Sequence, residues 1–174
     1  MIFLKMNITL GEQLLLTTLS ISTIVEKLYL VKMCPIFYGY VLTDFEKYPE
    51  WNPFLTQVKG ALKPLETLTV TAHPSSSVAR TFFPQMVSVE DGVEFSWLVQ
   101  FHYPKLLDGH HIFRLEKLDE NRTRFVHNEN FKGFLLFAHL LLRWKHTELG
   151  FNEMNEALKR RCEEQAKQVE GVAA

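Results

Sequence analysis

The middle of the chain carries a two-residue repeat of large apolar side chains, the pattern of half-buried β-strands. In the clearest run, residues 93–101, the repeat consists of Phe95, Trp97, Val99 and Phe101. Two later runs repeat this alternation, with His111, Phe113 and Leu115 on one face of residues 109–118, and Thr123, Phe125, His127, Glu129 and Phe131 on one face of residues 122–131. One face of each strand is therefore predicted to be buried.

Turn signals divide the chain from residue 54 to residue 131 into consecutive strands. Asp91-Gly92 is the dipeptide most typical of a tight hairpin. An earlier run that mixes Ile, Val, Leu and Thr predicts a first strand. The short connections predict an antiparallel meander. The predicted strands span residues 19–31, 54–62, 66–73, 80–90, 93–101, 109–118 and 122–131.

Helical signals lie on both sides of the meander. Residues 38–47 predict a short helix that ends where Tyr48 precedes Pro49. Residues 48–54 contain two prolines and predict a rigid turn or a single helical turn. Beyond residue 133 the apolar repeat changes to three or four residues, which predicts one helix from near residue 137 past residue 164. At about 1.5 Å per residue this helix is on the order of 40 Å long.

Together these elements predict an α+β fold. A curved antiparallel sheet of about six to seven strands wraps around the long C-terminal helix, with two short helices after the first strand. Aromatic residues make up 13% of the chain, including 14 Phe, which is more ring surface than a small core needs. We expect the rings to line a cavity between sheet and helix. Gly150 costs about 1 kcal/mol within a helix, so we expect a strand or a ligand to approach the helix there.

Charge and cysteine content narrow the partners. The net charge is −1, from 19 basic and 20 acidic residues, which argues against a nucleic-acid partner. Cys34 and Cys162 match no metal or redox spacing, so we expect free thiols and a cytoplasmic protein. Residues 1–17 are interpreted as a leader, in which a signal or anchor is an open alternative. The uncharged run 13–25 is about half as long as a membrane span requires, so no stable membrane insertion is expected.

Four patches of the chain resemble one known family. They are Val-Leu-Thr-Asp-Phe-Glu-Lys-Tyr-Pro-Glu-Trp-Asn-Pro-Phe at residues 41–54, Asp-Gly-His-His-Ile-Phe at 108–113, Thr-Arg-Phe-Val-His-Asn-Glu-Asn-Phe-Lys-Gly at 123–133, and Gly-Phe-Asn-Glu-Met-Asn-Glu-Ala-Leu-Lys at 150–159. In this order they resemble the SRPBCC or START-like proteins, which share the helix-grip fold with the birch-pollen allergen. The polyketide cyclase/dehydrase branch is the most similar.

The resemblance covers roughly residues 41–164 and implies a single START-like domain over residues 18–170. Residues 27–40 depart from the family pattern, because they do not look like its turn and helix start. The resemblance implies a cavity for a hydrophobic small molecule of lipid-, aromatic- or polyketide-like character, held as a carrier or sensor. The alternative is a cofactor-independent cyclase or dehydratase. Relatives of this fold that bind other proteins make an interaction module a third possibility.

The candidate ligand-binding residues are mostly aromatic. Trp51 and Phe54 follow the proline-rich turn, which in this fold lies near the cavity mouth, and strand alternation turns Trp97 and Phe101 inward. The full set is Trp51, Phe54, Trp97, Phe101, Phe113, His127, Phe131, Phe151 and Met154. Each of these residues either touches a ligand or fills the core.

The candidate chemistry lies in an inward polar set. His111, His127 and Glu129 share faces with apolar residues, and an inward Glu without a partner costs several kcal/mol or stays protonated. His111 and Glu129 are the candidate catalytic acid–base pair. The alternative is a hydrogen-bonded network that fixes the sheet or orients a polar ligand head. No nucleotide, metal or serine-nucleophile motif occurs in the sequence, so no cofactor and no metal ion are expected.

Overall fold

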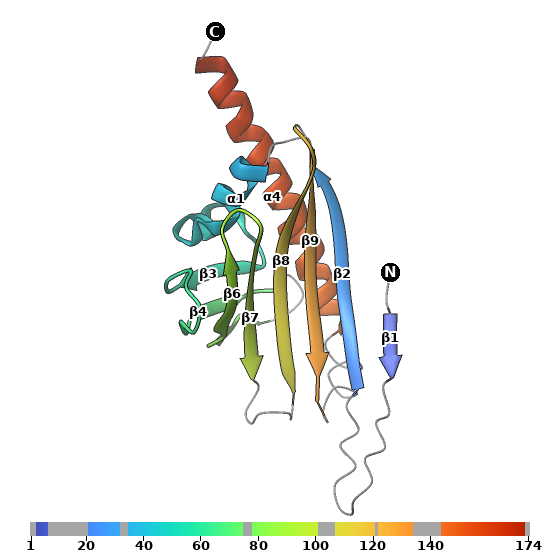
Figure 1. Cartoon of the computed structure of the whole chain (residues 1–174). Coiled ribbons are helices and arrows are strands. Elements are labelled where there is room, and N and C mark those ends of the chain that lie inside the picture. The colour runs from blue at the N-terminus through green and yellow to red at the C-terminus, as the bar shows by residue number, and fades with distance from the viewer. Residues whose placement is uncertain are drawn as a thin grey trace, which may run out of the picture.

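The computed structural model describes residues 3–6, 21–31, 35–74, 78–100, 107–120, 122–133 and 144–172. Six strands form an antiparallel sheet in the order β1-β2-β9-β8-β7-β6, and one long helix, α4 (Trp144–Val172), crosses behind β8 and β9 (Figure 1). The strands are β1 (Phe3–Met6), β2 (Ile21–Val31), β6 (Gln85–Glu90), β7 (Glu94–Gln100), β8 (Asp108–Asp119) and β9 (Arg122–Lys132). The predicted α+β class and the long helix across the sheet are confirmed.

A second, smaller sheet has the order β3-β4-β5. Its strands are β3 (Leu55–Lys59), β4 (Thr69–Ala72) and β5 (Arg80–Phe82). The prediction of one strand over residues 80–90 is wrong, because β5 and β6 belong to different sheets. Pro84 has no N–H to donate to a strand ladder, and its carbonyl oxygen accepts from the Leu68 N–H at 2.8 Å. An isolated bridge between Thr67 and Gln85 joins the two sheets at this corner.

Three short helical segments precede β3. The helix predicted over residues 38–47 is two elements, α1 (Pro35–Thr43) and the 3-10 turn η1 (Phe45–Lys47). Asp44 lies between them with non-helical dihedral angles, φ −78° and ψ 77°. The single helical turn expected at the two prolines is α2 (Tyr48–Trp51). Tyr48 is fully buried, and its hydroxyl donates to the Leu42 carbonyl oxygen at 2.6 Å, which ties α2 to α1.

The first and last elements differ from expectation in detail. Residues 3–6, inside the segment interpreted as a leader, form β1 and pair antiparallel with β2. Residues 27–31, where the family resemblance breaks off, continue β2 along β9. The predicted start of the long helix near residue 137 lies outside the described residues. At its far end α4 continues to Val172.

Gly150 sits where a side chain, not a strand or a ligand, meets the helix. A Cβ atom at this position would lie 2.2 Å from Cδ2 of Phe54. The ring of Phe54 therefore takes the space that any larger residue would need. The expectation of a close approach was right, but its source is a core aromatic that comes just before β3.

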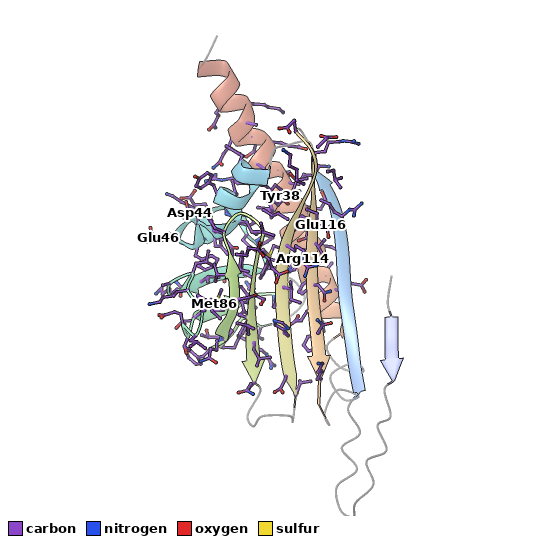
Figure 2. All side chains as sticks on the ribbon, viewed as in Figure 1. Tyr38, Asp44, Glu46, Met86, Arg114 and Glu116 are labelled. Atoms are coloured by element: carbon purple, nitrogen blue, oxygen red, sulfur yellow. The ribbon has the colours of Figure 1, made fainter. Side chains whose placement is uncertain are left out.

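The predicted alternation decides which face of the main sheet is buried. On β8 the buried positions are Gly109, His111, Phe113 and Leu115, and on β9 they include Thr123, Phe125, His127, Glu129 and Phe131. The outward face of β8 carries cross-strand ion pairs, with Arg114 bonded to Glu94 at 2.6 Å and Glu116 to Arg124 at 3.0 Å (Figure 2). Such exposed pairs are worth less than about 1 kcal/mol each, so the inward face carries most of the packing energy.

Candidate functional site

A chain of three polar side chains runs from β8 through β9 to α4. Nε2 of His111 lies 2.5 Å from Nε2 of His127, and Nδ1 of His127 lies 2.7 Å from Oδ1 of Asn155. All three residues are buried, with Asn155 and His127 at 0% exposure. The strand register explains the contact between the two histidines. Phe113 stands directly opposite His127, and His111 lies two positions before Phe113 on the same face, so the histidines are diagonal neighbours.

The amide of Asn155 sets the proton positions in this chain. Its Oδ1 atom is an acceptor only, so Nδ1 of His127 carries the hydrogen and Nε2 of His127 is left as an acceptor. His111 then donates its Nε2–H to His127. No described hydrogen bond uses Nδ1 of His111. Burial lowers the pKa of His127 to about 3, against the opposing effect of Asn155. Burial and the neighbouring His127 lower the pKa of His111 well below 6.5.

Aromatic rings enclose both imidazoles. His127 stacks on Phe151 of α4 with ring centroids 3.9 Å apart and an interplanar angle of 7°. His111 stacks on Phe113 at 4.3 Å and 11°, and Trp97 meets His111 edge-on at 5.3 Å. Each histidine is thus held as a neutral, flat member of an aromatic cluster, a state that the low pKa values also require.

Glu129 stands directly opposite His111 in the register of β8 and β9. It is 8% exposed, and burial raises its pKa to about 8. Within the described part of the chain its carboxyl group makes no hydrogen bond and no ion pair. The carboxyl lies against Gly109, where a Cβ atom would come 3.0 Å from Oε1 of Glu129 and 3.3 Å from the ring of Phe131. Gly109 is therefore what makes room for the acid.

The structure brings most of the predicted ligand-binding residues into one buried cluster. Trp97, Phe113, His127, Phe151, Phe131 and Met154 all belong to the interior. Phe54 reaches the same cluster by packing on Phe151 at 5.8 Å. Trp51 is half-buried and packs instead on Tyr48 at 4.9 Å. Phe101 lies outside the described residues.

Two residues of the candidate site, Asn155 and Gly109, were not predicted from the sequence. Asn155 follows Phe151 by four residues and precedes Leu158 by three, so it occupies the buried face of the helix, and this polar residue at an apolar position was the available signal. Gly109 entered the sequence prediction only as the first residue of a strand. Its role depends on the residue across the strand pair, which the sequence alone does not place.

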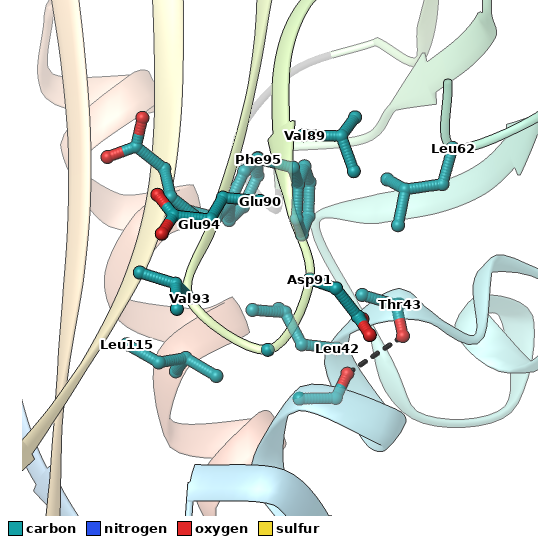
Figure 3. A pocket seen from close by; sticks show the side chains of 13 residues that line it. Leu42, Thr43, Leu62, Val89, Glu90, Asp91, Val93, Glu94, Phe95 and Leu115 are labelled. Carbon is teal, nitrogen blue, oxygen red and sulfur yellow. Dashed lines mark hydrogen bonds between the residues drawn. The ribbon is translucent and has the colours of Figure 1, made fainter. Parts of the chain in front are cut away.

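A small cleft opens at the other end of the cluster (Figure 3). It lies between the end of α1, Leu62 and the β6–β7 hairpin at Asp91-Gly92, and the rings of Phe95 and Phe113 contribute to its lining. Its volume is about 20 Å³, roughly what one water molecule occupies. This cleft is too small to accept an organic ligand.

Among the helices that the structure describes, none combines the length and the apolar composition needed to span a bilayer.

Comparison with known proteins identifies the fold. A START superfamily protein from Mycobacterium smegmatis superimposes with a TM-score of 0.64 at 17% identity, over 82% of this chain and 98% of that chain. A norcoclaurine synthase point mutant from Thalictrum flavum, in complex with a transition-state analogue, gives 0.64 at 8% identity, over 84% and 98%. The Zhui aromatase/cyclase from Streptomyces sp. R1128 gives 0.61 at 13% identity, over 83% and 96%.

The sequence comparisons add no closer relative: no family model matches the chain, and no curated protein matches it. Each superposition includes almost the entire length of the neighbouring chain. The chain therefore has the START-like helix-grip fold, as its four sequence patches predicted. At these identities the likeness concerns the fold alone.

Proposed function

We propose that the protein binds a hydrophobic small molecule of lipid-, aromatic- or polyketide-like character inside the sheet-and-helix grip, as a carrier or sensor. The observation that carries this proposal is the inward face of the main sheet, where stacked rings from β7, β8, β9 and α4 share the interior with the buried carboxyl group of Glu129. A polar group without a partner is costly in an apolar interior unless something else satisfies it. A ligand with an apolar body and one polar atom fits both parts of this surface.

Two structural neighbours support the choice of ligand class. Norcoclaurine synthase from Thalictrum flavum has been seen in complex with dopamine and hydroxybenzaldehyde, at a TM-score of 0.62 and 9% identity. A di-domain aromatase/cyclase of the steffimycin biosynthetic pathway matches at 0.60 and 16% identity. These proteins place aromatic chemistry on this fold. A cytoplasmic location, expected from the two widely separated cysteines, is part of the same proposal.

Native mass spectrometry of protein purified from its natural source tests the proposal. We expect a bound mass of a few hundred daltons that is lost on denaturation and that rebinds to the stripped protein with one-to-one stoichiometry. The Glu116→Gln variant, changed on the outward face of β8, is the matched control and should rebind equally well. If the protein arrives empty and neither a lipid nor a polycyclic aromatic panel binds saturably, the carrier proposal is wrong.

A second candidate function is a cyclase or dehydratase that acts on a ligand held against the same inward face of the sheet. The observation that favours it is the high pKa of Glu129, about 8, because a carboxylic acid that is still protonated at neutral pH can act as a general acid. His111, directly across the strand pair, offers Nδ1 as a base. Glu129→Gln and His111→Phe separate the two functions when ligand affinity and turnover are measured independently. Retained binding with lost turnover favours the enzyme, whereas no turnover in the wild type leaves only the carrier.

A further inference from the structure

The carboxyl group of Glu129 is the starting point for a more specific inference, which rests on the proposed function. It is 92% buried, since its exposed fraction is 8%, and no hydrogen bond or ion pair reaches it from the side chains that the structure describes. A buried carboxyl group normally has at least one hydrogen-bond partner. One that lacks them is either a defect of the fold or the receptor for something that the chain itself does not supply.

No side chain of β8 crowds the carboxyl group on the Gly109 side. Gly109 lacks the Cβ atom that any other residue would place only 3.0 Å from Oε1 of Glu129, which is a tight contact. The ring of Phe131 borders the same space, at 3.3 Å from that position. The acid therefore lies beside an apolar wall and a stretch of bare backbone, and the neighbouring β8 residue presents no side chain that would block it.

Among the residues whose side chains the structure describes, none provides a positive charge next to Glu129. On β8 its direct neighbour is His111, and on β9 the nearest inward residue is His127, two positions away. Burial lowers the pKa of both imidazoles, so both are neutral. His110 and Asp108 on β8 and Lys132 on β9 occupy the alternate positions, whose side chains point to the opposite face. α4 meets this region through the uncharged Phe151 and Asn155. On β2, Val25 is paired with Glu129 and Lys27 with His127.

From this geometry we propose that the protonated carboxyl group of Glu129 donates a hydrogen bond to an oxygen atom of the ligand. The ligand class is then an apolar or aromatic molecule that carries a neutral acceptor such as a ketone, aldehyde or ester carbonyl. A ligand carboxylate is disfavoured at this position, because it would add a second acid beside the first in a region with no described cation. Burial and the resulting high pKa of Glu129 support the protonated state.

Matched naphthalenes test the proposal with the full chain. The fluorescent reporter is N-phenyl-1-naphthylamine, which is neutral and apolar. Its displacement is measured with 2-acetylnaphthalene, with 2-isopropenylnaphthalene, which replaces the carbonyl oxygen by CH₂ at the same shape, and with 2-naphthoate. At pH 6.5 we expect the wild type to prefer the ketone over the hydrocarbon by about five- to tenfold, the range of one hydrogen bond. The preference should shrink at least threefold at pH 9.5, where the carboxyl group is ionised.

Two variants at residue 129 and two controls complete the experiment. Glu129→Leu should lose the preference at both pH values while it still binds the reporter. Glu129→Gln keeps a donor that does not ionise, so its preference should no longer depend on pH. Glu116→Gln should behave as the wild type. Lys27→Met should also leave the preference unchanged, and a preference that appears only in this variant would show that Lys27 ionises Glu129 and would overturn the proposal.

The outcomes distinguish this inference from the function on which it rests. If the wild type binds neither the reporter nor any naphthalene, the hydrophobic-ligand function fails and the inference fails with it. If the reporter binds and ketone and hydrocarbon displace it equally in the wild type, the cavity exists but Glu129 does not recognise an oxygen. Displacement by 2-naphthoate as effective as by the ketone at pH 6.5 also contradicts the inference. Circular dichroism of each variant shows that it is folded, and Glu129→Gln suffices should Glu129→Leu not fold.

Discussion

Replacement of Glu129 by Gln is expected to change how the stability of the protein depends on pH. Burial raises the pKa of this carboxyl from 4.5 to about 8 in the folded protein. An acid whose folded pKa is raised stabilises the fold fully below its unfolded pKa and progressively less as the pH rises to its folded pKa. The loss therefore begins above pH 4.5 and is complete just above pH 8. Gln has nearly the same shape and does not ionise, so the variant lacks this loss.

The size of the effect follows from the shift. One pKa unit corresponds to about 1.4 kcal/mol, so a shift from 4.5 to about 8 sets an upper limit of about 5 kcal/mol. Partial hydration of a carboxylate that is 8% exposed reduces this value, and we expect about 2–4 kcal/mol. This is a large share of the 5–15 kcal/mol that typically separates folded from unfolded domains.

Urea unfolding of the wild type and of Glu129→Gln at several pH values between 5.5 and 9 measures the effect. The free energy of unfolding of the variant, minus that of the wild type, should increase by about 1.5–3 kcal/mol across this range, because the first pH unit of the effect lies below pH 5.5. His111 and His127 act in the opposite direction, since their lowered pKa values make their contribution complete above pH 6.5 and lost on acidification. Their contribution is the same in both proteins and cancels in the difference.

Glu120→Gln provides the matched control, because the side chain of Glu120 is 86% exposed and its replacement should leave the pH dependence unchanged. A difference between Glu129→Gln and the wild type that stays constant within about 0.5 kcal/mol from pH 5.5 to pH 9 would refute the reasoning. The carboxylate would then be satisfied inside the fold, for example by Lys27, which stands opposite His127 on β2.

Three further changes test the packing around the candidate site. Gly150→Ala should destabilise the protein by about 1–3 kcal/mol in urea unfolding, because the new Cβ atom overlaps the Phe54 ring and this overpacking outweighs the gain in helix propensity. Asn155→Leu should cost about 1–3 kcal/mol by the same assay, since Nδ1–H of His127 loses its buried acceptor, and the NMR signal of that proton should shift. Tyr48→Phe should raise the unfolding rate and lower the free energy of unfolding by about 1–2 kcal/mol, because one buried hydrogen bond is lost. An unchanged midpoint of urea unfolding would contradict this contribution.

Strand alternation made the inner face of the sheet predictable. Large side chains at every second position of residues 93–131 marked the buried face, and His111, His127 and Glu129 lie on it as expected. The long helix and the single helical turn at Pro49 also followed from local signals. These features depend on residues near one another in the chain, which is why a single sequence carries them.

Contacts between distant segments were not predictable from the same pattern. The division of residues 80–90 between two sheets depends on Leu68, just before β4, whose N–H donates to the carbonyl oxygen of Pro84. The pairing of His127 with Asn155 joins residues 28 positions apart. Strand alternation predicts which face of the sheet a side chain lies on, but it does not predict which residue that side chain contacts.

The contacts along α4 have a consequence for how its length can vary. Phe54 occupies the space beside Gly150, His127 bonds Asn155, and Glu50 bonds Arg161 at 2.7 Å. Deleting or inserting one residue between positions 150 and 161 would rotate everything beyond it by about 100°. Asn155 would then turn away from His127, or Arg161 away from Glu50. Related chains that keep these three anchors should therefore hold this eleven-residue spacing constant and accommodate insertions only before or after it.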